Sequence, residues 1–374
     1  MVRNNRKARW VPRHAQEKRF QHWLENAKDW CFSRNRYWGN PIPIWTDEDY
    51  KVVECIGSVA ELKKRAAIWG DIADLHRESI DSFVISKEGK FLRRIPEVFD
   101  CWFESGAMPF ASAHYPFSTQ EPQFAKTFPA DFIAEGLDQT RGWFYTLNVL
   151  ASAVRDETPY SNLIVNGLVL AEDGKKMSKR LKNYPDPMQV ASTHGADAVR
   201  LYLVNSGLSR SEPLNFSEKG VKEVVKQVLI PWHNSLRFLQ QNQERLASLG
   251  KDPSLGNLNI LDRWIQSRTA ALVLKFKKQM ESYQLYGITA LVEEYLEDLS
   301  NWYIRLNRSR IKGANGPQEA KTSLALLHDA LYRFTLVMAP FTPFYAEHSF
   351  QQLQALSPRS EAESVHHVQL SPLF

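Results

Sequence analysis

The hydrophobic pattern changes near Phe216, and this change constrains the fold more than any other feature of the sequence. Downstream of it, apolar residues recur three and four positions apart, which is typical of the buried face of an amphipathic helix. Two such series cover residues 288–306 and 324–341. Four prolines separate the helical stretches: Pro231, Pro253, Pro317 and Pro340. We therefore expect a bundle of four to five helices over residues 216–374.

Upstream of Phe216, short apolar runs alternate with polar loops. Residues 98–103, 131–134 and 163–171 are apolar runs that suit buried parallel strands, and residues 142–154 suit a helix between the last two. Parallel strands need a crossover, which is usually a helix, so residues 1–215 predict an α/β layer. The polar segments that follow the three runs are expected to converge on one face, at the carboxyl ends of the strands.

Two stretches within residues 1–215 depart from this alternation. Residues 30–45 are rich in aromatic residues, arginine and proline, which predicts an extended, buried segment that crosses the domain. Residues 47–94 combine short apolar runs with a charged helical piece at 59–67. We interpret them as a small insertion.

Composition excludes several classes of protein. Of 374 residues, 43% are hydrophobic and 24% are charged, so the chain is neither disordered nor collagenous. No apolar run approaches the ~18 residues of a membrane span. Cys31, Cys55 and Cys101 form no CxxC pair, which argues against a cysteine metal site and favours a reducing compartment. The net charge of +5 permits an anionic partner without identifying one.

Residues 171–183 carry the most concentrated charge. The five basic side chains of this segment are Lys175, Lys176, Lys179, Arg180 and Lys182. On charge alone, a solvated loop is the more common explanation. The alternative is a cationic clamp for a triphosphate, to which Ser178 adds a hydroxyl group.

The segment FIAEGLDQTRGWFY, at residues 132–145, decides between these alternatives. Glu135 and Asp138 suit the hydroxyl groups of a ribose, and Gly136 lets a ligand approach the backbone. Gln139 can both donate and accept hydrogen bonds. A purely structural explanation would make Asp138 a helix cap and bury Trp143 in the core.

Together these segments resemble motifs of the class I aminoacyl-tRNA synthetases, and most specifically the isoleucyl type of the eukaryotic cytosol. KMSKR at 176–180 is similar to the KMSKS signature, with Arg180 in place of the usual serine, and AEGLDQTRGWFY is similar to the ribose and amino-acid motif. WCFSRNRYWGNPIP, DCWFESG and LSNWYIRLNRSR match further blocks in the same order. The resemblance implies the second half of a Rossmann-like catalytic domain over 1–215, with a small insertion at about 47–94, and a helical anticodon-binding domain over 216–374.

The resemblance also implies roles for individual residues. Lys176 and Lys179 would stabilise the triphosphate while the carboxylate of isoleucine attacks the α-phosphate. The implied ATP and adenylate site comprises Glu135, Gly136, Asp138, Lys176, Met177, Ser178, Lys179 and Arg180. The implied isoleucine pocket comprises Trp102, Gln139 and Trp143. The implied tRNA contacts are Trp302, Arg305, Arg308 and Arg310, although these residues equally suit a helix that packs on one face and is solvated on the other.

The implied substrates are isoleucine, ATP with Mg²⁺, and tRNA-Ile, in the cytoplasm and without a membrane. No HIGH-type tetrapeptide occurs in the sequence. We therefore expect a fragment that lacks this motif and the editing domain and that is inactive alone. Two alternatives stay open, a non-catalytic tRNA-binding module and a sibling valyl- or leucyl-tRNA synthetase. The sequence says nothing about association with other synthetases.

Overall fold

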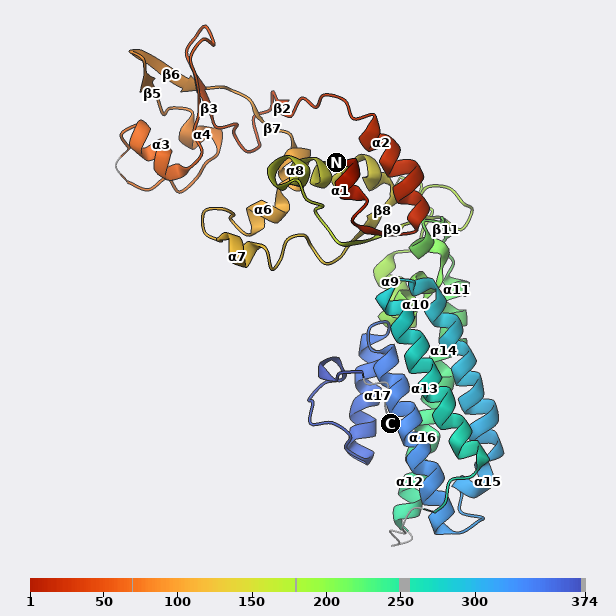
Figure 1. Cartoon of the computed structure of the whole chain (residues 1–374). Coiled ribbons are helices and arrows are strands. Elements are labelled where there is room, and N and C mark those ends of the chain that lie inside the picture. The colour runs from red at the N-terminus through yellow and green to blue at the C-terminus, as the bar shows by residue number, and fades with distance from the viewer. Residues whose placement is uncertain (69, 179, 249–255, 371–374) are drawn as a thin grey trace. The chain divides into compact units, whose positions relative to one another are not determined.

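The computed structural model describes residues 1–68, 70–178, 180–248 and 256–370 (Figure 1). The chain forms two compact units, Met1–Ile164 and Val165–Phe374. The domain boundary that we expect at residue 215 stays a prediction. Within the described ranges, no helix is both long and apolar enough to cross a membrane.

A three-stranded sheet organises the first unit. Its strand order is β1 (Arg9–Val11), β9 (Asn162–Asn166) and β8 (Ile133–Gly136), and β1 runs parallel to β9. The helix α8 (Trp143–Arg155) follows β8 and leads to β9 (Figure 1). The strand, helix and strand predicted from residues 131–171 are therefore confirmed. α8 ends at Arg155, and the next residue, Asp156, adopts the left-handed conformation that terminates many helices.

The apolar run at residues 163–171 forms two strands rather than one. After β9, β10 (Val169–Leu170) pairs in parallel with β11 (Leu214–Asn215) in the second unit. The backbone of Glu212 passes so close to Gly167 that a Cβ on this glycine would lie 1.8 Å from the Glu212 carbonyl oxygen. Only glycine fits this crossing of two backbone segments.

The prediction of a parallel strand at residues 98–103 is wrong. β7 (Val98–Phe99) pairs antiparallel with β2 (Ser33–Arg34), and α5 (Cys101–Gly106) begins directly afterwards. Asp100 starts this helix, because its carboxylate accepts a hydrogen bond from the backbone nitrogen of Trp102 over 3.1 Å. Residues 104–106, which we expected in a loop, therefore lie in a helix.

The small insertion is an antiparallel sheet with its own core. The strand order is β4 (Val53–Cys55), β3 (Ile44–Thr46), β6 (Lys90–Arg94) and β5 (Ile85–Lys87). The helices α3 (Val59–Arg65) and α4 (Arg77–Ile80) complete it, and α3 confirms the helix predicted at 59–67. The core side chains are Trp45, Ile56, Leu62, Ile85 and Leu92.

Residues 30–45 are not the single buried strand that we expected. They contribute only β2 and the start of β3, and Tyr37 and Trp38 are 64% and 70% exposed. Their aromatic composition suggested burial, but both rings stay largely exposed and contact the start of α4: the Trp38 ring stacks on His76 at 4.2 Å between centroids, and the Arg77 guanidinium lies 6.0 Å from the Tyr37 centroid. The remaining short helices of the first unit are α1 (Val2–Asn5), α2 (Gln21–Glu25), α6 (Met108–Ser112) and α7 (Glu121–Phe124).

The second unit is mainly helical, as predicted. Its shorter helices are α9 (Pro187–His194), α10 (Ala196–Asn205), α11 (Glu218–Val224) and α15 (Arg308–Ile311). The longer ones lie side by side in a bundle (Figure 1): α12 (Ile230–Ser248), α13 (Ile260–Glu281), α14 (Ile288–Glu297), α16 (Pro317–Met338) and α17 (Pro343–Leu356). Trp232, Tyr295 and Phe334 are fully buried in its core.

Of the four separating prolines, Pro253 lies outside the described residues, and Pro231 does not act as expected. Pro231 does not separate two helices, because the π-helical segment Val225–Leu229 joins α11 to α12 without a break. A π-helical turn is wider than an α-helical one and accommodates a residue that cannot donate a backbone hydrogen bond. Pro317, in contrast, lies at the first position of α16, where the missing N–H group has no cost.

Candidate functional site

The first unit brings the predicted amino-acid pocket together by close packing of α5 on α8. A Cβ on Gly106 would lie 2.9 Å from the backbone of Thr146, so glycine allows the two helices to approach each other. A Cβ on Gly142 would lie 3.0 Å from the ring of Trp102 and 2.7 Å from Oε1 of Gln139. Gly142 is therefore the point at which Trp102 and Gln139 meet.

Trp143 is held from two sides. Its indole Nε1 donates a hydrogen bond to the carbonyl oxygen of Ser105 over 2.9 Å, and its backbone nitrogen donates to Oε1 of Gln139 over 3.0 Å. Gln139, rather than Asp138, thus caps the start of α8. The ring of Trp143 is half-buried, and that of Trp102 is 42% exposed. Both rings thus have surface available to a ligand.

Asp100 fixes the start of α5 and with it the position of Trp102. Its carboxylate accepts hydrogen bonds from the Trp102 backbone and from Nε1 of Trp30, and it forms an ion pair with Arg34. Burial alone would raise the pKa of Asp100, but these hydrogen bonds and the charge of Arg34 together lower it. The carboxylate is therefore charged at neutral pH.

The acidic residues predicted to hold a ribose lie at the end of β8. Glu135 is exposed on this strand, and Asp138 is exposed in the 3₁₀ turn Leu137–Arg141 that follows. Nε2 of Gln139 donates a hydrogen bond to Asp138 over 3.2 Å. A Cβ on Gly136 would lie 2.6 Å from the Asp138 carboxylate, so the Asp138 side chain would have to shift if another residue replaced this glycine.

An open cleft of about 1060 Å³ adjoins Trp102 and Gly142. Its wall includes Trp23, Trp30, Arg34, Arg141 and Tyr145. The guanidinium group of Arg141 lies 4.1 Å from the ring centroid of Trp23, a distance typical of a cation–π contact. Our sequence reasoning missed this wall, although the aromatic and basic residues of 22–36 were a signal for it.

The basic loop lies in the second unit. Ala171 and Lys175 close a turn through a hydrogen bond of 2.9 Å between the Ala171 nitrogen and the Lys175 oxygen, with Gly174 at φ +78°. Lys175 and Lys176 are both exposed; Lys175 pairs with Asp173 over 3.2 Å, and Lys176 forms a bridge to Leu170 through its backbone. The two lysines thus differ in their contacts, because Lys175 has an ion pair within the turn and Lys176 has a backbone bridge to the preceding strand.

In the described part of the rest of this loop, Asn183 contacts the backbone. Met177 and Ser178 are half-buried, and Arg180 is exposed. The side chain of Asn183 forms hydrogen bonds with the backbone on both sides of Met177. Lys179 lies outside the described residues. The expected convergence of this loop with residues 135–139 joins two units and stays a prediction.

In the helical unit, three of the four predicted RNA contacts are accessible. Trp302 is 55% exposed in the π-helical segment Asp298–Ile304, and Arg305 and Arg308 are exposed. The guanidinium group of Arg308 lies 5.9 Å from the ring centroid of Phe238 on α12. These side chains place two positive charges and an aromatic ring at the surface of the bundle.

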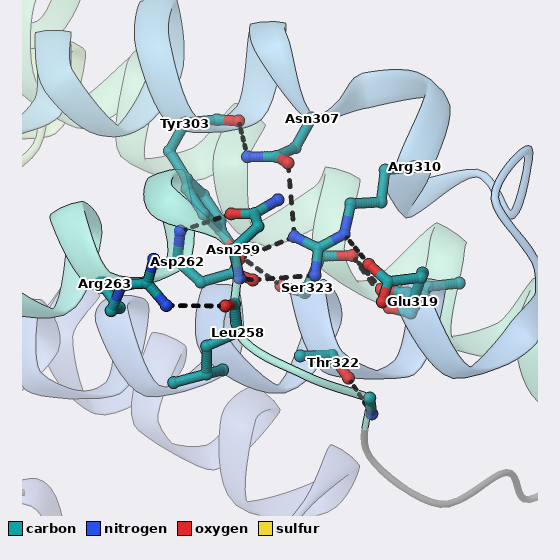
Figure 2. Close-up of polar contacts among 12 residues, drawn as sticks. Leu258, Asn259, Asp262, Arg263, Tyr303, Asn307, Arg310, Glu319, Thr322 and Ser323 are labelled. Atoms are coloured by element: carbon teal, nitrogen blue, oxygen red, sulfur yellow. Dashed lines mark hydrogen bonds and ion pairs between the residues drawn. The ribbon is translucent and has the colours of Figure 1, made fainter.

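Arg310 corrects our expectation, because it is only 4% exposed. Figure 2 shows its guanidinium group beside the carboxylate of Asp262, with hydrogen bonds of 2.7 and 2.8 Å. Nε of Arg310 donates to Glu319 over 2.6 Å. Burial alone would lower the pKa of Arg310, but Asp262 and Glu319 raise it. This arginine joins α13, α15 and α16 rather than presenting its charge to a ligand.

Asp262 is the centre of this buried network. It is fully buried, and it forms a capping box with Asn259 at the start of α13, with two hydrogen bonds of 2.9 Å (Figure 2). The hydroxyl group of Tyr303 donates to Asp262 over 3.3 Å, and burial raises the pKa of this tyrosine. Within the described part of the chain, no group of three or more His, Cys, Asp or Glu side chains could hold a metal ion.

Comparisons with known proteins find relatives for both units of the chain. Residues 1–215 match the family "tRNA synthetases class I (I, L, M and V)", and residues 262–372 match "Anticodon-binding domain of tRNA ligase". A probable cytoplasmic isoleucine–tRNA ligase of Dictyostelium discoideum is 50% identical over 98% of this chain and 35% of its own length. The cytoplasmic isoleucine–tRNA ligase of Saccharomyces cerevisiae is also 50% identical, over 95% of this chain and 34% of its own.

The chain therefore spans about a third of the length of the curated relatives it matches. Solved structures have the same fold at lower identity. A methionyl-tRNA synthetase of Mycobacterium tuberculosis in complex with methionyl-adenylate gives a TM-score of 0.68 at 16% identity, over 99% of this chain and 63% of its own. A leucyl-tRNA synthetase of Agrobacterium radiobacter gives a TM-score of 0.63 at 23% identity, over 93% of this chain and 44% of its own.

Proposed function

The chain belongs to the class I tRNA synthetases of the I, L, M and V group, and we propose that it forms the part of an isoleucine–tRNA ligase that selects isoleucine and activates it. Trp102 and Gln139 meet at Gly142, beside Trp143, and this grouping is the observation that carries the proposal. Two aromatic faces with one amide group suit a branched aliphatic side chain next to a polar α-carbon. The relatives named as isoleucine–tRNA ligases support the choice of isoleucine.

In this proposal, the exposed carboxylates of Glu135 and Asp138 accept hydrogen bonds from the ribose of an adenylate. Gly136 leaves the backbone open beside them. ATP is the proposed second substrate, and Mg²⁺ enters with it as part of the substrate complex. A methionyl-adenylate complex among the structures of the same fold supports an adenylate at this site.

In the activation step, a carboxylate oxygen of isoleucine attacks the α-phosphorus of ATP. The bond from this phosphorus to the bridging oxygen breaks, and pyrophosphate leaves. Lys176 is exposed and stabilises the negative charge that grows on the phosphate oxygens, and Lys179 is assigned the same role from the sequence. A ribose hydroxyl at the 3′ end of tRNA-Ile then attacks the aminoacyl carbonyl, and AMP leaves.

For the helical unit, we propose that Trp302, Arg305 and Arg308 contact tRNA. The anticodon-binding match over residues 262–372 supports this assignment. Phosphate oxygens attract the two guanidinium groups, and an exposed tryptophan provides a stacking surface for an unpaired base. The relatives named as cytoplasmic ligases support the same compartment for this chain.

Isoleucine-dependent exchange of pyrophosphate into ATP tests the proposal. The protein to use is a complete ligase that contains this chain, because the sequence carries no HIGH-type motif. Exchange that prefers isoleucine over valine and leucine supports the proposal. A preference for valine or leucine would assign the chain to a sibling synthetase, and binding of tRNA without any exchange would assign it to a non-catalytic module.

A further inference from the structure

The side-chain amide of Asn183 holds the backbone that carries Lys176. Its Oδ1 accepts a hydrogen bond from the Ser178 nitrogen over 2.9 Å, and its Nδ2 donates to the Lys176 carbonyl oxygen over 3.2 Å. In an extended strand, the C=O group of one residue and the N–H group two residues later point to the same side. The amide of Asn183 therefore pairs with residues 176–178 as a neighbouring strand would.

The loop around Asn183 is built to keep this arrangement. The nitrogens of Leu181 and Lys182 donate to the Ser178 carbonyl oxygen over 3.1 and 3.0 Å, which closes a tight turn. Lys182 has φ +47°, a conformation that is unfavourable for a residue with a Cβ and that reverses the chain directly before Asn183. Three residues later, Asp186 caps α9 through the Met188 nitrogen over 2.7 Å. Asn183 thus lies between a tight turn and a fixed helix start.

Met177 shows what this pairing does to the side chains. It lines a recess of about 420 Å³ together with Asn183, Tyr184 and Phe216. Since neighbouring side chains of an extended segment point to opposite sides, Met177 in the recess leaves Lys176 on the outer side. Lys176 is exposed, in agreement with this.

We propose that Asn183 is a positioning residue for phosphate activation, which acts by holding residues 176–178 extended so that Lys176 faces the triphosphate. This inference rests on the proposed function. Without the amide, the two backbone groups bond to water, and Lys176 samples many positions. A flexible lysine loses charge stabilisation in the transition state, whereas isoleucine binds to Trp102, Gln139 and Trp143 and is unaffected.

The first experiment needs no catalysis. Amide hydrogen exchange is measured in the 374-residue chain for the unmodified sequence, Asn183→Ala, Asn183→Asp and the control Gln189→Ala, which removes an exposed amide side chain from α9. In Asn183→Ala we expect the Ser178 amide to exchange about tenfold faster, because it loses its acceptor. Asn183→Asp retains an acceptor and should protect Ser178. Equal protection of Ser178 in Asn183→Ala and the unmodified chain would overturn the pairing.

The second experiment separates positioning from simple stability. In a complete ligase that contains this chain, Asn183→Ala should lower the kcat of pyrophosphate exchange about tenfold and leave the KM for isoleucine and the melting temperature nearly unchanged. Gln189→Ala should change neither constant. Faster exchange at Ser178 with an unchanged kcat would overturn the positioning role. A parent ligase without isoleucine-dependent exchange would instead refute the proposed function, and the Ser178 result would still decide the pairing.

Discussion

The indole nitrogen of Trp143 donates a hydrogen bond to the carbonyl oxygen of Ser105 over 2.9 Å, which ties the start of α8 to α5. The ring of Trp143 stays half-buried next to Gly142, the residue that lies against the ring of Trp102. We therefore expect Trp143 to contribute both to stability and to isoleucine binding, and two substitutions distinguish these contributions.

We predict that Trp143→Phe lowers the free energy of unfolding by about 1–2 kcal/mol, because the Ser105 oxygen loses its partner. In Trp143→Ala, the space left by the missing ring should raise the KM for isoleucine at least about tenfold. In Trp143→Phe an aromatic face remains, so the KM for isoleucine should rise less. Urea unfolding and exchange kinetics in the complete ligase measure both effects. Trp302→Ala is the matched control, since this exposed tryptophan lies in the helical unit. If both Trp143 variants lost only stability, the ring would be core and not pocket.

Lys175 and Lys176 are neighbours with different surroundings. Both are exposed, but Lys175 forms an ion pair with Asp173, whereas Lys176 forms a backbone bridge to Leu170. We predict that Lys176→Ala lowers the kcat of pyrophosphate exchange about 100-fold with little effect on ground-state ATP binding, whereas Lys175→Ala lowers it less than about threefold. Lys179→Ala should resemble Lys176→Ala. Equal effects at positions 175 and 176 would mean that the loop contributes only general positive charge.

Arg308 and Arg310 provide a second matched pair. Arg310→Met leaves the buried carboxylate of Asp262 without its partner, and we predict a loss of roughly 3–5 kcal/mol in the free energy of unfolding. Arg308→Ala should leave stability unchanged, weaken tRNA-Ile binding and reduce the salt dependence of binding by about one counterion. Urea unfolding measures the stability of both variants, and fluorescence anisotropy measures their binding to tRNA-Ile. A stable Arg310→Met variant with weak RNA binding would restore Arg310 as a direct contact.

The carboxylate of Asp47 in the insertion gives a pH prediction. A hydrogen bond from Lys90, together with those from the nitrogens of Val52 and Lys51, lowers its pKa from 3.8 to about 2. Because the folded-state pKa is the lower one, this carboxylate stabilises the insertion above about pH 4 and loses that effect as the pH falls toward 2. Carboxyl carbon shifts measured by NMR should give a midpoint near 2. A midpoint near 3.8, with no change in Lys90→Ala, would show that the ion pair does not form in solution.

Long-range periodicity and the succession of motifs were predictable from the sequence. The helical spacing of residues 288–341 and the strand, helix and strand of 131–171 depend on local pattern, and the structure confirms both. The antiparallel β7 was not predictable in this way, because an apolar run does not reveal the direction of its partner strand. β7 ends where Asp100 caps the start of α5, so this boundary depends on a single residue.

The burial of individual polar side chains was also not predictable from the sequence. Arg308 and Arg310 are two positions apart in one basic motif, and only the fold places one in solvent and the other against Asp262. Asn183 is a further example, because its role depends on a turn at Lys182 with positive φ. Such tertiary contacts leave no periodic signal in a single sequence.

Amino-acid preference in a chimeric ligase is the most direct test of the account. This chain would replace the matching third of the Saccharomyces cerevisiae cytoplasmic isoleucine–tRNA ligase, which supplies the rest of the protein. We predict pyrophosphate exchange with the highest kcat/KM for isoleucine, well above valine and leucine, and its loss in the same chimera with Lys176→Ala. A folded chimera that prefers valine or leucine, or that shows no exchange while it binds tRNA, would contradict the account.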